Sequence, residues 1–144
     1  MLDQIFQAAT LAAMLGWLAL LVSPWAPIWS DRVAGTFVPL VLSVGYTVLI
    51  VAFWGEADVG FATLDDVAAL FASREVLLAG WVHYLAFDLF VGAWEVRQAR
   101  RDALPFLFVV PCLVLTFLAG PLGLAFFFAL RLALRRRVVS GEPS

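Results

Sequence analysis

The sequence predicts an all-α integral membrane protein with four transmembrane helices, the fourth of them kinked at Gly120-Pro121. Two observations support this fold class. Hydrophobic residues make up 64% of the 144 residues and the mean hydropathy is +0.99, whereas soluble domains are about 45–50% apolar. Four apolar stretches each approach the ~20 residues that cross a bilayer. We therefore expect one membrane domain over residues 1–139, followed by a disordered tail at residues 140–144.

The first apolar segment runs from Ile5 to Val22 and the second from Thr36 to Trp54. Asp3 and no basic residue precede the first segment, so we expect it to be retained rather than removed as a signal peptide. Pro24 and Pro27 follow it, and prolines stop helix propagation because they lack the backbone N–H. These two prolines therefore mark the first loop.

The third segment runs from Val76 to Val96 and follows an acidic stretch, Glu56 to Glu75. Within that stretch, Leu64 to Phe71 is predicted to be a short amphipathic helix on the membrane surface, because acidic residues occupy its first turn and apolar residues follow. Ser73 is expected to cap the third segment, since a serine hydroxyl accepts a hydrogen bond from the free N–H groups of a first helical turn.

The fourth segment runs from Leu104 to Leu134 and is interrupted by Gly120-Pro121. A proline inside a helix removes a backbone hydrogen bond and clashes with the preceding turn, so we expect a kink or a break here. If all four segments cross the membrane, the arginines near the span ends are divided almost equally between its two sides. The positive-inside rule then gives no clear orientation, although the dense cluster Arg135 to Arg137 favours cytoplasmic termini.

Composition argues against several classes of function. Charged residues are 14% of the chain and the net charge is −2, so no basic surface is expected to bind nucleic acid. His83 and Cys112 are the only imidazole and thiol, which is too few for a zinc site, and we expect no metal. No phosphate-binding loop, dinucleotide fingerprint or nucleophile motif is present, so we expect no cofactor.

The ionisable residues His83 and Asp88 lie deep in the third segment. Asp88 is about 18 Å from Val76 and about 13 Å from Arg97 along a helix, which places it near the membrane midplane. An aspartate at that depth costs about 2.5–3.5 kcal/mol on insertion scales and is a functional candidate by default. The alternative is a structural role, in which Asp88 fixes helix packing through a hydrogen bond.

His83 and Asp88 are about 140° apart on an ideal helix, so they do not share a face. Two interpretations remain open. The third helix is central and touches neighbours on two sides, or His83 reaches a cavity while Asp88 anchors the bundle. Asp88 shares its face with Trp81, Leu85, Gly92 and Glu95; His83 shares another with Gly80, Phe87, Phe90 and Trp94. We expect the third helix to contact all the others, and Trp81, Asp88 and Gly92 to be less exposed to lipid than Val82 and Leu89.

Other segments supply polar and aromatic side chains that can either bond helices together or line a pocket. The polar ones include Asp3, Gln7, Thr10, Ser43, Tyr46, Thr47 and Thr116. With 13 phenylalanines and 6 tryptophans in the chain, such a pocket would be aromatic. It would suit a flat polyene or another lipid-soluble ligand.

The third and fourth segments resemble those of the ABA4-like family, whose plant members are associated with the formation of neoxanthin from violaxanthin. The matching residues are Ala79-Gly80-Trp81-Val82-His83-Tyr84-Leu85-Ala86-Phe87-Asp88-Leu89-Phe90, followed by a basic segment and Gly120-Pro121-Leu122-Gly123. The acidic residue Glu75 also resembles a family position. This resemblance implies a cofactor-free carotenoid isomerase that acts on an epoxidised xanthophyll, with His83 as the base and Asp88 as the acid. Burial disfavours the charged form of both groups, which suits those roles.

The side chains expected to contact such a ligand are Tyr46, Trp81, Tyr84, Phe87 and Glu95. The alternative function is non-catalytic: a pigment- or lipid-binding subunit of a larger membrane complex, or of a homo-oligomer. In either case the expected surroundings are membrane lipid. The arginine-only basic composition indicates a bacterial inner (cytoplasmic) membrane.

Overall fold

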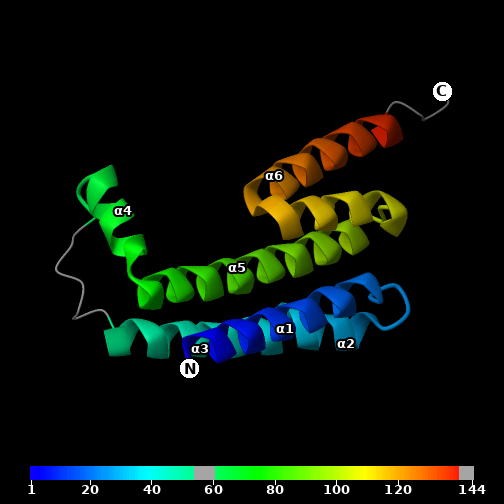
Figure 1. Ribbon diagram of the computed structural model, residues 1–144. Helices are drawn as coiled ribbons and strands as arrows, with labels where there is room; N and C mark the ends of the chain where they lie inside the picture. Colours follow the sequence, from blue (N-terminus) through cyan, green and yellow to red (C-terminus); the bar gives the residue numbers. More distant parts are fainter. Residues whose placement is uncertain (54–60, 140–144) are drawn as a thin grey trace.

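The structure, a computed structural model, describes residues 1–53 and 61–139. Every element in these residues is helical (Figure 1): α1 (Leu2–Leu21), α2 (Pro27–Arg32), a π-helical turn η1 (Val33–Phe37), α3 (Val38–Phe53), α4 (Leu64–Ala72), α5 (Arg74–Arg101) and α6 (Phe106–Val139). Four helical stretches of this part of the chain are long and apolar enough to cross a membrane: residues 2–21, 27–53, 74–101 and 106–134. The predicted all-α, multi-pass membrane fold is confirmed.

The second apolar stretch begins earlier than the predicted Thr36. Pro27 occupies the first turn of α2, where a missing backbone N–H removes no helical hydrogen bond. From there α2, η1 and α3 continue without a break to Phe53. The predicted end of this stretch at Trp54 lies outside the described residues, as does the predicted tail at residues 140–144.

The central helix of the bundle is α5, which contacts α1, α3, α4 and α6. Figure 1 shows it between α6 and the layer formed by α1 and α3. The expectation that this helix contacts all the others is confirmed. The expected order of exposure is wrong, because Trp81 is 38% exposed whereas Val82 and Leu89 are 2% and 0% exposed. Residues seven apart on α5 form its main packing seam, and Val82, Leu89 and Val96 follow that spacing.

The predicted short helix over Leu64 to Phe71 and the predicted cap at Ser73 are confirmed, whereas the cap at Thr63 was not predicted. The Asp66 backbone N–H donates to Thr63 Oγ1 over 3.1 Å, and the Thr63 N–H donates to Asp66 Oδ2 over 3.0 Å, which together form a capping box for α4. The Ser73 hydroxyl accepts a bond of 3.5 Å from the first turn of α5. Leu70 is only 3% exposed, so this face of α4 packs on the protein rather than on the membrane surface.

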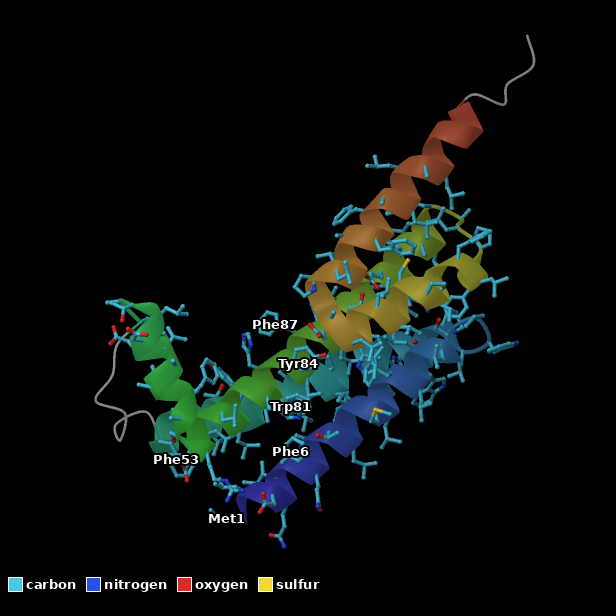
Figure 2. The ribbon with its side chains drawn as sticks, turned by 45° about the horizontal axis from the view of Figure 1, so that its top comes forward. Met1, Phe6, Phe53, Trp81, Tyr84 and Phe87 are labelled. Carbon is cyan, nitrogen blue, oxygen red and sulfur yellow. The ribbon has the colours of Figure 1, made fainter. Side chains whose placement is uncertain are left out.

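The predicted kink in α6 is confirmed at Ala119, whose φ of −156° and ψ of 73° are not helical. The two halves of α6, residues 106–118 and 120–139, form a hairpin in both views (Figures 1 and 2). Pro121 falls in the first turn of the second half, where proline is tolerated. A Cβ atom added to Gly123 would collide with the backbone of Thr116, so glycine permits the close contact between the two halves.

Candidate functional site

Asp88 lies where the turn of α6 touches the middle of α5. A Cβ atom added to Gly120 would collide with the Asp88 carboxylate, so any larger residue here would displace that carboxylate. The Gly120 backbone and the Tyr84 side chain are polar neighbours of this carboxylate. Gly120 starts the second half of α6, whose first-turn N–H groups lack helical partners and carry the positive end of the helix dipole. The carboxylate therefore faces a helix N-terminus inside the bundle.

Tyr84 joins Asp88 to a row of aromatic rings between α1 and α5 (Figure 2). Its hydroxyl donates to the Phe117 carbonyl oxygen over 2.7 Å. Its ring centroid is 5.4 Å from that of Trp81, which is 5.5 Å from that of Phe6. The Trp81 indole Nε1–H donates to Thr10 Oγ1 over 3.1 Å. The Trp81 indole is thus hydrogen-bonded to α1, and the Tyr84 hydroxyl is hydrogen-bonded to α6.

Three adjoining pockets lie along one face of α1 and together form a groove, which we call the α1 groove. The first, of about 380 Å³, lies between α1, α4 and α5, and the Asp3–Arg74 ion pair of 2.8 Å lies in its wall. The second, of about 450 Å³, shares Trp81 and Tyr84 with the first. The third, of about 170 Å³, shares Met14 and Phe117 with the second.

The α1 groove extends from Leu2 to Leu21 along α1, a rise of about 28 Å. This length approaches the ~30 Å thickness of the hydrocarbon core. Its walls are apolar and aromatic apart from the ion pair at one end, Thr10, and Tyr84 near the middle. Such a groove can hold a long, stiff lipid with one polar end at the membrane surface.

His83 lies on a different face of α5 from Asp88, as the helical spacing predicts. Its side chain is exposed, and its ring centroid is 5.5 Å from Tyr46 and 4.6 Å from Phe87. None of these three residues lines the α1 groove. The structure therefore sorts the predicted site residues into two clusters. Trp81, Tyr84 and Asp88 lie beside the groove, whereas His83 contacts the rings of Phe87 and of Tyr46 on α3.

Glu95 belongs to neither cluster. It is 0% exposed, and its Oε1 accepts a hydrogen bond of 2.9 Å from the Thr116 hydroxyl on α6. Its Oε2 is buried with no hydrogen-bond partner among the described residues. Glu95 therefore holds α5 and α6 together in the interior and does not line the α1 groove. Within residues 1–53 and 61–139, no three His, Cys, Asp or Glu side chains lie close enough together to hold a metal ion.

Sequence reasoning missed two contributors to this site, Phe117 and Gly120. Gly120 is part of a recognisable helix-breaking pair, but nothing in the sequence indicates that the break docks on Asp88. Phe117 has no polar side chain, and its contribution is a backbone carbonyl that the nearby break brings to Tyr84. Thr10 and Trp81 were both identified from the sequence, but the hydrogen bond between them was not predicted.

The profile of a protein family described as ABA4-like, ABA DEFICIENT 4-like, matches residues 4–127 of the chain. Searches of curated proteins and of solved structures found no match. The matched region includes Asp88, Tyr84 and the turn of α6. It also includes nearly all of the α1 groove.

Proposed function

The chain belongs to the ABA4-like family, and on that premise we propose that it binds an epoxidised xanthophyll, or a similar isoprenoid, in the α1 groove and isomerises it by acid–base chemistry. The observation that carries this proposal is the position of Tyr84. Its ring lines the groove, and it neighbours the carboxylate of Asp88. A ligand in the groove would thus lie one side chain away from a proton-exchanging group in the membrane interior.

The shape and chemistry of the α1 groove support a polyene as the ligand. Its length of about 28 Å suits a rod that runs along the membrane normal. The rings of Phe6, Trp81 and Tyr84 offer flat apolar surfaces to a conjugated chain. At one end the Asp3–Arg74 pair, with side chains 78% and 70% exposed, can bond a hydroxyl on the terminal ring of such a ligand.

The proposed reaction needs no oxidant or cofactor. A base removes the proton from the vinyl carbon beside the epoxide, and the C–H electron pair forms the second double bond of an allene. The C–O bond on that side breaks, while the epoxide oxygen keeps its other C–O bond and takes up a proton. Every atom and electron is retained, so the product is an isomer.

We assign both proton transfers to Tyr84 and Asp88. His83, which the family resemblance suggests as the base, faces away from the groove and lies beside Tyr46. An isomerisation returns the proton that it removes, so one relay can accept the proton and then donate it. Asp88 is the proton store in this proposal, and the Tyr84 hydroxyl makes the contact with the ligand.

The test is the xanthophyll profile of carotenoid-producing cells with and without the chain, followed by variants. Tyr84→Phe and Asp88→Asn should lower turnover by about 10²–10⁴-fold, as expected for loss of general acid–base catalysis. Tyr46→Phe, on α3 beside His83, is the matched control, and together with His83→Gln it should leave turnover unchanged. Loss of activity in these two variants, with Tyr84→Phe active, would assign the reaction to the His83 cluster instead.

One observation favours a non-catalytic function as the second candidate. Asp88 already faces the N-terminus of the second half of α6, so its carboxylate has a structural use without any reaction. The chain would then be a pigment- or lipid-binding subunit of a membrane complex. In that case a polyene should copurify with the chain chemically unchanged. Trp81→Ala should reduce the bound amount, whereas Trp25→Ala, at an 82% exposed tryptophan outside the groove, should not.

A further inference from the structure

We propose that α6 enters and leaves the membrane at the same face as a re-entrant helical hairpin, so that the chain crosses the membrane three times and carries nearly all its arginines on the cytoplasmic side. All four apolar stretches remain in the membrane in this proposal. The proposal assigns the path of the fourth stretch through the membrane and the orientation of the whole chain.

Contacts along α5 define the direction in which the second half of α6 runs. Gly120 meets Asp88, and Phe127 packs against Trp94 with ring centroids 5.8 Å apart. The Arg131 Nε–H then bonds Asp102 Oδ2 over 2.5 Å. The second half of α6 therefore runs in the same direction as α5, towards the C-terminal end of α5. From Asp88 to Asp102 the rise is about 21 Å, and from Gly120 to Arg131 it is about 16 Å.

This direction brings Arg131 back to the end at which α6 begins. Asp102 immediately follows α5, and α6 starts at Phe106. A helix that crossed the membrane would instead carry residue 131 towards the other end of α5, near Arg74. The side chains of Arg131 and Asp102 are only 16% and 8% exposed, so the pair is a packed contact rather than a loose surface pair.

The middle of α5 supplies what a turn at this depth requires. Unpaired backbone groups in hydrocarbon cost several kcal/mol each, so a non-helical residue near the midplane is tolerated only where protein satisfies its neighbours. The Tyr84 hydroxyl bonds the carbonyl of Phe117 before the turn. The Asp88 carboxylate faces the backbone of Gly120 after it. An unbroken fourth crossing would need neither group.

The arginine distribution supports the same path independently. With four crossings, four arginines lie on one side and five on the other. With a re-entrant α6, one side carries only Arg74. The other side carries the remaining eight: Arg32, Arg97, Arg100, Arg101, Arg131, Arg135, Arg136 and Arg137. The positive-inside rule then places the C-terminal end of α5 in the cytoplasm and α4 on the opposite side.

This path has a consequence for the α1 groove. The turn of α6 reaches Phe117 and Leu118 at the second pocket and goes no further. The first pocket is lined by residues of α1, α4 and α5, and no residue of α6 is among those that line it. The groove opens sideways to lipid in the leaflet opposite the cytoplasm, and its occupant reaches it from that leaflet.

Single-cysteine labelling tests the path without any assay of activity. Cys112 is buried, and Cys112→Ala gives a background without thiols. Ala62→Cys and Ala103→Cys report on the two sides, since both residues are exposed and one crossing, α5, separates them. Ser140→Cys reports on the side reached after α6. The probe is a membrane-impermeant maleimide, applied to intact bacterial spheroplasts and then to opened membranes.

The proposal expects Ala62→Cys to be labelled in intact spheroplasts, and Ala103→Cys and Ser140→Cys only after the membrane is opened. Labelling of Ser140→Cys together with Ala62→Cys would overturn the re-entrant path. Labelling of Ala103→Cys and Ser140→Cys in intact spheroplasts, with Ala62→Cys protected, would overturn the orientation. Should a cysteine variant fail to insert, protease protection of epitope tags placed before Met1 and after Ser144 gives the same discrimination in the unsubstituted chain, because the re-entrant path puts the two tags on opposite sides and four crossings put them on one side.

Discussion

Polar side chains of α5 satisfy polar groups of α6 at two depths. Asp88 and Tyr84 serve the turn of α6, and Glu95 bonds Thr116 two turns further along. In hydrocarbon no water is present to form hydrogen bonds with such groups, so each contact specifies where α6 packs on α5. A catalytic use of Asp88 would be added to this structural use, and conservative substitutions can separate the two.

Substitution of Asp88 distinguishes these uses. Asp88→Asn keeps the shape and one acceptor oxygen, so it should fold and insert normally but lose turnover if Asp88 exchanges a proton. Asp88→Leu removes the acceptor and should destabilise the bundle by about 0.6–2 kcal/mol. Xanthophyll turnover measures the effect of Asp88→Asn, and thermal unfolding in detergent measures the effect of Asp88→Leu. A fully active Asp88→Asn, His83→Gln double variant would exclude acid–base catalysis by either residue.

Glu95 gives a second prediction at this scale. Thr116→Val removes the hydroxyl that bonds Glu95 Oε1 and leaves a buried carboxyl group without that donor, which should lower the free energy of unfolding by about 1–3 kcal/mol. Thr47→Val is the matched control, since the Thr47 hydroxyl is exposed and donates within its own helix to Ser43 over 2.8 Å. Equal unfolding temperatures for the two variants would show that the Glu95 contact contributes nothing.

Among the elements, α6 depends most on individual glycines. Gly120 fits against a carboxylate, and Gly123 fits against the backbone of Thr116. The break in α6, the short helix α4 and the cap at Ser73 could be predicted, because proline chemistry and capping act locally. The start of the second stretch at Pro27 rather than Thr36 was not predicted. The reversal of α6 could not be predicted. A crossing helix and a re-entrant hairpin have the same hydropathy, and the direction is set by contacts with Trp94 and Asp102 far away in sequence.

Alanine substitutions test this dependence on glycine. Gly123→Ala places a methyl group against rigid backbone, so the two halves of α6 must move apart, at a cost of about 1–3 kcal/mol. Gly45→Ala is the matched control, because a Cβ atom there meets nothing within 4 Å and alanine favours helix. Thermal unfolding should therefore shift down for Gly123→Ala and stay level or rise for Gly45→Ala. The opposite order would mean that the hairpin is not closely packed.

At the scale of the whole molecule, composition was sufficient to predict a multi-pass membrane protein, and the α5 motif was sufficient to identify the family. The different faces of His83 and Asp88 also followed from helical spacing. Which face lies against protein could not be predicted, since α5 is apolar nearly all round and its burial is decided by its neighbours. Trp81 shows this: its indole is bonded to Thr10, yet more than a third of the residue remains exposed.

The ion pair between Arg131 and Asp102 closes the hairpin onto α5 and should be energetically coupled. A double-mutant cycle with Arg131→Ala and Asp102→Ala should give a coupling above about 1 kcal/mol, since both side chains are mostly removed from water. The exposed pair Arg74–Asp3 serves as the control and should give less than about 1 kcal/mol. A coupling for Arg131 and Asp102 no larger than the control would remove one support of the re-entrant path.

The π-helical turn η1 holds one residue more than an α-helical path of the same rise would need. Without that additional residue, α2 would be rotated by about 100° about the helix axis relative to α3. Asp31 would then point away from Arg100, which it bonds over 3.2 Å. Removal of a single residue from Val33–Phe37 should therefore convert the turn to regular helix and break this pair while α3 keeps its place. The second crossing can thus tolerate the deletion of one residue at this point, but its first turns then lose their alignment with Arg100 on α5.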